Sequence, residues 1–462
     1  MPARALAMLT AAAVAATTGA LAPQRTRAQE TPTSGLPIIR DTEIEQLVRD
    51  YAEPILRAAG LAKQNVRVVI LNDRAFNAFV MDGRHIFVNA GALFEAKTPN
   101  EIIGVFAHET GHLADGHLLR LRERLAAAQT ESIVAMLLGI GAMVAGATAT
   151  RGHDIGNVGA VAMGAPQSMI QRSLLAYVRT QEDQADHAAV KFLTATHQSP
   201  KGLLDLFKRL SNEMLFSKAD PYLQSHPLPP DRVAALEAMA KASPYWGVKD
   251  PPALQLRHDM MRAKLSGFLE RPDTVLRRYP LTDHSLPARY ARAISTYRFS
   301  DLNRAIAEID SLIKAQPNNP YFHELKGQAL LESGHPAEAI APLRRAVQLT
   351  RRPALIQIML GQALIATNNR KFADEAVRLL QTAISREPEM PSAYTQLAMA
   401  YGQKGDYPHA DLASAQAAFT RGDVKTARQL AERAKHGLPV GSPAWVRADD
   451  IVTVKMPRAK SN

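Results

Sequence analysis

Residues 107–117 read AHETGHLADGH, and the five residues His108-Glu109-Thr110-Gly111-His112 determine how the rest of the chain is interpreted. On a helix, four residues advance the chain by about 400°, so the two imidazoles lie on one face, one turn apart. At that spacing both rings can reach one zinc ion, and Glu109 stands beside them as a base for a water molecule. The apolar run that starts at Pro99 predicts the helix that this arrangement needs.

A catalytic zinc site needs a third protein ligand, and because the chain has no cysteine, that ligand must be His, Asp or Glu. The favoured candidate is Glu182 in QEDQAD, residues 181–186. Asp186 shares a helical face with it and could accept a hydrogen bond from a ligand imidazole. His117 is predicted to lie on the opposite side of the helix that carries His108 and His112, and to be structural. Three rival ligands remain: His153, Asp183 and His187.

The residues before this motif predict a small sheet between helices. An amphipathic helix is expected over 41–60, and β-branched or alternating patterns predict strands over 66–71 and 84–89. Residues 77–79 are expected to form a turn-rich link. The resemblance described below implies that the second strand, 84–89, serves as the edge strand near the metal.

The N-terminal segment has the pattern of a secretory signal. Arg4 precedes an apolar run, and Thr26-Arg27-Ala28 follows with small residues at the positions that signal peptidase reads. Cleavage after Ala28 predicts export, and export without cysteine is typical of a bacterial periplasm. The uncharged stretch 132–150 leaves three interpretations: a flap over the site, a buried hairpin or a membrane span. Peripheral membrane contact through 132–165 therefore stays open.

The charge of the chain gives little sign of nucleic-acid binding. The formal net charge is +11, but the basic residues are spread among acidic ones, with no basic stripe interleaved with aromatics. A solvated basic surface is the expected consequence, and no nucleic-acid partner is predicted.

The C-terminal part repeats. Ala293, Gly327 and Gly361 stand 34 residues apart, and a small or apolar residue recurs in the helix that follows each. A period of 34 with small residues at the helix crossings is similar to tetratricopeptide repeats. Small residues let paired helices approach closely, and stacked pairs bury a continuous core.

Several motifs together resemble one group of gluzincins, the HtpX and CAAX-prenyl-protease family. They are NAF at 77–79, FVN at 87–89 with Gly91, the HETGH motif with His117, and Tyr177-x-Arg179-x-x-Glu182-x-x-Ala185-Asp186. The resemblance implies one Zn²⁺ per chain, ligated by His108, His112 and Glu182. It also implies Glu109 as general base and Asp186 as the orienting partner of a ligand. In SHPLPPDR, residues 225–232, it implies a regulatory His226 that can reach the zinc. Two roles stay open for Arg232: steadying this loop, or stabilising the tetrahedral intermediate.

The sequence thus predicts a mainly α protein with a small β-sheet: a signal peptide (1–28), an α+β gluzincin protease domain (29–270) and an all-α tetratricopeptide-repeat solenoid (271–462). The resemblance implies a periplasmic zinc endopeptidase of unfolded or misassembled polypeptide, including outer-membrane β-barrel proteins. The repeats would then contact substrate or the β-barrel assembly machinery. The alternative is a repeat-based chaperone or assembly factor whose metal site is latent or little used.

Overall fold

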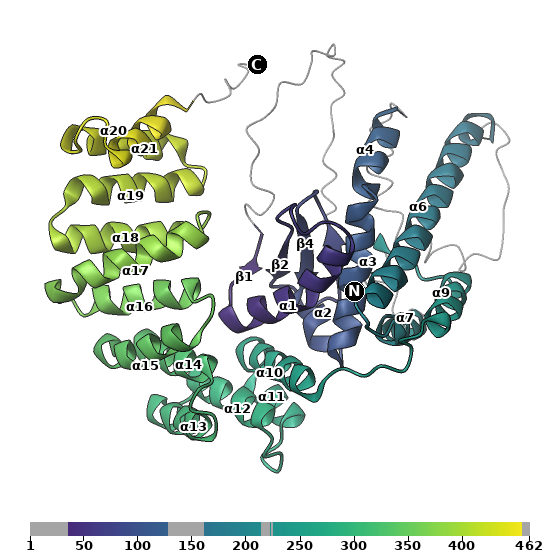
Figure 1. The fold of residues 1–462 in the computed structure, drawn as a ribbon, viewed down its shortest axis with the longest axis horizontal. Coiled ribbons are helices and arrows are strands. Elements are labelled where there is room, and N and C mark those ends of the chain that lie inside the picture. Colours follow the sequence, from purple (N-terminus) through teal and green to yellow (C-terminus); the bar gives the residue numbers. More distant parts are fainter. Residues whose placement is uncertain (1–35, 128–160, 214–221, 223–224, 455–462) are drawn as a thin grey trace, which may run out of the picture.

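The computed structural model describes residues 36–127, 161–213, 222 and 225–454, and shows an α+β domain followed by a curved array of paired helices (Figure 1). The predicted mainly α architecture with one small sheet is confirmed. The predicted signal peptide and the stretch 132–150 lie outside the described residues. In the described part of the chain, no helix is both long and apolar enough to cross a membrane.

The sheet has four strands in the order β1-β2-β4-β3: β1 (Ile38–Ile39), β2 (Arg67–Leu71), β4 (His85–Asn89) and β3 (Ala78–Val80). β2 and β4 are parallel, whereas β1 and β3 pair antiparallel at the two edges. The strand predictions for β2 and β4 are confirmed.

Two details of the sheet prediction are wrong. The supposed link at residues 77–79 contains most of β3, because its three residues pair with β4 and Phe79 stacks on Phe87 with ring centroids 5.2 Å apart. Three residues are too few for an alternating pattern to be recognised. In consequence β4 is a central strand, and β3 is the edge strand on that side.

The helices of this domain begin where the sequence provides caps. The Asp41 carboxylate accepts the Ile44 N–H at the start of the first helix, and Thr98 caps the third, which has Pro99 in its first turn. The helices are α1 (Thr42–Ala58), α2 (Ala90–Glu95), α3 (Pro99–Ala114), α4 (His117–Ala127), α6 (Val161–Ala195), α7 (Lys201–Glu213) and α9 (Pro230–Ala242).

Helix α3 lies in the middle of the domain because two glycines let its neighbours approach. A Cβ added at Gly111 would lie 3.0 Å from Ala185 Cα of α6, and one at Gly104 would lie 2.6 Å from Leu203 Cβ of α7. Both contacts are too close for a larger side chain. The HETGH helix is thus held between α6 and α7, which fixes where its histidines point.

The C-terminal helices form stacked antiparallel pairs, as the 34-residue period predicts. A Cβ at Gly327 would lie 2.4 Å from Leu343, and one at Gly361 would lie 2.9 Å from Leu380, so each glycine marks a close crossing. The helices are α10 (Pro252–Leu269), α11 (Pro272–Arg278), α12 (Leu286–Phe299), α13 (Leu302–Ala315), α14 (Pro320–Glu332), α15 (Pro336–Leu349), α16 (Ala354–Ala366), α17 (Ala373–Arg386), α18 (Pro391–Lys404), α19 (Tyr407–Thr420), α20 (Val424–Gly437) and α21 (Pro443–Thr453).

A buried charge cluster joins the two parts. Lys264 of α10 is buried, with its Nζ 2.7 Å from Asp41 and 3.2 Å from Glu43 at the start of α1. Glu324 of α14 lies 3.9 Å from the same Nζ and accepts a hydrogen bond from Thr42. Three carboxylates from two parts of the chain therefore share one ammonium group.

Candidate active site

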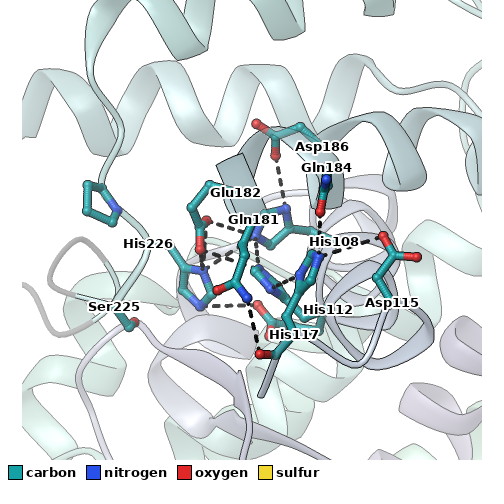
Figure 2. A network of polar contacts seen from close by, with 12 residues as sticks. His108, His112, Asp115, His117, Gln181, Glu182, Gln184, Asp186, Ser225 and His226 are labelled. Carbon is teal, nitrogen blue, oxygen red and sulfur yellow. Dashed lines mark hydrogen bonds and ion pairs between the residues drawn. The ribbon is translucent and has the colours of Figure 1, made fainter. Parts of the chain in front are cut away.

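The first two predicted ligands meet on α3 as their spacing requires. The Nε2 atoms of His108 and His112 lie 3.1 Å apart (Figure 2). Glu182 reaches them from α6, with Oε2 3.4 Å from His108 Nε2 and Oε1 3.5 Å from His112 Nε2. His108 and Glu182 are buried, and the side chain of His112 is 12% exposed. The structure brings these three predicted residues together in one pocket of donor atoms.

The donor set fits a zinc ion. Two imidazole nitrogens and a carboxylate face one another inside the protein, and a cation at their centre would satisfy all three lone pairs. For zinc–nitrogen bonds of about 2.0–2.1 Å, ligand atoms of a tetrahedral site lie about 3.3 Å apart. The 3.1 Å between the two Nε2 atoms is close to that value. The zinc expected from the sequence therefore fits, and it would act as a Lewis acid on a bound water.

His226 supplies a fourth donor to the same centre. Its Nδ1 lies 3.4 Å from His108 Nε2 and 3.1 Å from Glu182 Oε2, and the donor atoms of His108, His112, Glu182 and His226 all lie within 4.8 Å of one another. The ring packs against Tyr222 with centroids 4.8 Å apart. Four protein donors complete a tetrahedral set, whereas a catalytic zinc needs one open position. The structure therefore places four possible donors around one centre.

A carboxylate and a guanidinium frame the first ligand. Asp186 Oδ1 lies 2.9 Å from His108 Nδ1, and Arg232 donates to both oxygens of Asp186 at 2.7 and 2.9 Å. Arg232 Nη1 also lies 2.9 Å from Glu182 Oε2 and donates to the carbonyl of Pro227 in the His226 loop. Burial opposes the charge on His108, but the two neighbouring carboxylates outweigh it and raise its pKa to about 9. The site thus has a negative potential that favours a bound cation.

Glu109 sits beside the donors, and its carboxylate is buried. It is 1% exposed, and among the described residues neither oxygen has a hydrogen-bond partner. The His226 ring is a close neighbour, with its Nε2 3.5 Å from Oε1. Burial raises the pKa of the Glu109 carboxyl, although the imidazoles of His226 and His108 oppose the shift. A carboxyl with a raised pKa next to the metal position holds a proton more readily than an ordinary glutamate, as a group that takes up and returns a proton must.

The placement predicted for His117 was wrong. Helix α3 ends at Ala114, and Gly116 adopts a left-handed φ of 63°, so the helical spacing from His108 no longer applies. His117 begins α4 instead and its Nδ1 lies 2.9 Å from Nδ1 of His112. The one signal of this bend in the sequence is Gly116, since glycine often marks a helix end.

Of the three rival ligands, the two that the structure describes do not reach the metal centre. His187 and Asp183 are exposed on α6, and His187 Nδ1 contacts the Asp183 backbone carbonyl at 2.7 Å. His153 lies outside the described residues. Gln184 and Gln181 were not predicted as site residues; they contact the His117 side chain and carbonyl.

Comparison with known families places this fold and site. Residues 39–240 match peptidase family M48, and residues 290–354 match the tetratricopeptide repeat. The chain therefore carries a zinc metalloprotease domain of peptidase family M48, followed by a tetratricopeptide-repeat region.

Individual relatives share both parts. The beta-barrel assembly-enhancing protease of Yersinia pestis is 22% identical over 426 residues, which cover 89% of this chain and 83% of that protein. The protein of the same name from Escherichia coli K12 is 22% identical over 427 residues, with the same coverage. A Vibrio cholerae protein assigned that name is 25% identical over 299 residues, 62% of this chain and 58% of that protein.

Proposed function

We propose that this chain is a periplasmic zinc metalloendopeptidase that cleaves unfolded or misassembled polypeptides during outer-membrane protein assembly. The observation that carries the proposal is the convergence of His108, His112 and Glu182 around one point. Beside it lies the buried carboxyl of Glu109, which has no hydrogen-bond partner among the described residues. The relatives named above, which align over most of the chain, support the pathway. The leader-like residues 1–28 support export.

The roles of the site residues follow from their contacts. His108, His112 and Glu182 hold the metal, and Glu109 moves the proton between water and the leaving amine. Asp186 keeps the His108 ring in place, and Arg232 neutralises Asp186.

His226 acts as a latch in this proposal. Its Nδ1 fills the fourth donor position that water needs, so the resting enzyme cleaves slowly until the loop moves. Arg232 ties the loop to the site, because one guanidinium binds the Pro227 carbonyl and the two carboxylates of α6. Opening the loop therefore requires the loss of a part-buried hydrogen bond between Arg232 and Pro227.

Substrate selection in this proposal belongs to two surfaces. The edge strand β3 offers backbone pairing to an extended polypeptide, which favours unfolded chains over any particular side chain. The repeat domain, proposed to span 271–462 after a protease domain over 29–270, recruits the substrate or the β-barrel assembly machinery. An unfolded outer-membrane β-barrel protein would present such strands.

Zinc content and peptide cleavage test the proposal. The purified chain from Gln29 should bind one zinc per molecule and cleave casein. Glu109→Gln should bind zinc equally well, but its rate of casein cleavage should fall about 100-fold or more, as expected for a lost general base. Glu338→Gln, in which an exposed glutamate of α15 is changed, is the matched control and should cleave as wild type does. Casein cleavage that survives Glu109→Gln would refute the assignment.

The closed donor set favours a second candidate, a repeat-based chaperone with a latent metal site. Complementation separates the two functions. If Glu109→Gln restored every outer-membrane defect of a strain that lacks the protein, the chaperone function would be the dominant one. If it restored none, proteolysis would carry the phenotype.

A further inference from the structure

The frame of Asp186 and Arg232 holds only one of the two ligand imidazoles. His112 makes a different contact, because its Nδ1 lies 2.9 Å from Nδ1 of His117. At that distance the two nitrogens form a hydrogen bond, so one carries the proton and the other accepts it. The side chain of His117 is only 3% exposed, so its ring is largely screened from water.

The direction of this hydrogen bond follows from the other ring nitrogen of His112. Its Nε2 faces His108 and Glu182 at 3.1 and 3.5 Å, so Nε2 is the atom offered to a metal. A neutral imidazole that ligates through Nε2 carries its proton on Nδ1. The Nδ1–H of His112 then donates to His117, whose proton must sit on Nε2. That Nε2–H donates to Gln184 Oε1 at 3.0 Å, so each donor meets an acceptor.

The position of His117 is built by two helices. The left-handed turn at Gly116 follows the end of α3 and lets His117 start α4 beside that end. Gln181 of α6 donates its amide to the His117 backbone carbonyl at 3.1 Å. Asp115 lies 3.7 Å from His117 Nε2, too far for a hydrogen bond, and is exposed. Helix α6 therefore forms hydrogen bonds with both the backbone and the ring of His117.

We infer that His117 is the positioning residue of His112, fixing the tautomer and the ring orientation with which His112 ligates zinc. The inference rests on the proposed metal site and extends it. The two ligand imidazoles are supported by different chemistry. His108 contacts a carboxylate that is itself bound by a guanidinium, whereas His112 contacts an imidazole that is itself bound by an amide. Partners of this kind orient ligands in zinc sites, and their loss typically lowers metal affinity about 10–100-fold.

A pair of isosteric substitutions tests the inference. His117→Asn places an amide oxygen near the position of Nδ1 and keeps the acceptor, whereas His117→Leu has almost the same shape without it. The zinc dissociation constant of the full chain from Gln29 is measured by competition with a chromogenic chelator. His117→Leu should bind zinc about 10–100-fold more weakly than wild type, and His117→Asn within about 3-fold of it. His187→Leu, which changes an exposed histidine of α6, is the control and should match wild type.

A packing role predicts the opposite order, because an apolar leucine fills a buried site at least as well as asparagine does. Equal zinc affinity of His117→Leu and wild type, or equal weakening in both variants, would overturn the inference. The visible absorption of Co²⁺-loaded protein gives a second readout: the spectrum should change in His117→Leu and be preserved in His117→Asn. Failure of wild type itself to bind one zinc would instead refute the proposed metal site.

Discussion

Asp186 and Arg232 form an ion pair whose burial allows a quantitative prediction. Arg232 is 5% exposed and Asp186 1%, and the guanidinium binds both carboxylate oxygens. Asp186→Asn keeps the shape but leaves the Arg232 charge with Glu182 as its remaining anion. Removing one partner of a buried pair costs about 3–5 kcal/mol, and the retained Glu182 contact places the expected loss near 3 kcal/mol.

The assay is urea unfolding of the zinc-free chain, with Arg232→Met and the double variant completing a mutant cycle. The exposed pair Arg433–Asp411 offers a matched control, because it has the same two-point geometry but its arginine is 66% exposed. Asp411→Asn should cost about 0–1 kcal/mol. Equal costs at the two sites, to within about 0.5 kcal/mol, would refute the reasoning that burial makes this pair important.

Three further predictions concern packing and charge. Gly111→Ala should cost about 1–3 kcal/mol, because the new methyl group meets the α6 backbone at 3.0 Å, whereas Gly402→Ala, with open space, should be neutral or stabilising; urea unfolding measures both. Lys264→Met should cost about 3–5 kcal/mol by leaving three carboxylates without their ammonium, and Lys208→Met, whose exposed side chain pairs with one carboxylate, under about 1 kcal/mol. Burial would raise the pKa of Glu182, but the neighbouring imidazoles and the Arg232 guanidinium hold it well below its usual range. A lowered folded pKa gives stability above the unfolded value of about 4.3 that is lost as pH falls through the folded pKa, so a pH series of zinc-free unfolding should show stability falling below about pH 4.

The parts of this site that the sequence predicts are those governed by helical spacing. His108 and His112 lie four residues apart on one helix, and Glu182 and Asp186 do so on another, so each pair shares a face wherever the helix lies. That the two faces meet depends on the packing of α3 against α6, which no single-helix pattern contains. The resemblance to a known family supplied that link.

The parts that the sequence missed depend on the ends of elements. His117 follows the left-handed turn at Gly116, so extending the helix past Ala114 placed its ring on the wrong side. The short strand β3 was interpreted as a link because three residues show no period. A helix boundary shifted by two residues is enough to move a side chain from one face to another.

The central claim is that His226 closes a working zinc peptidase site that uses Glu109 as its base. The most direct measurement compares casein cleavage by zinc-loaded wild type, His226→Ala, and His226→Ala combined with Glu109→Gln. The account predicts faster cleavage by His226→Ala than by wild type, and a loss of about 100-fold or more when Glu109→Gln is added. Slower cleavage by His226→Ala with zinc still bound, or cleavage that persists in the double variant, would contradict it.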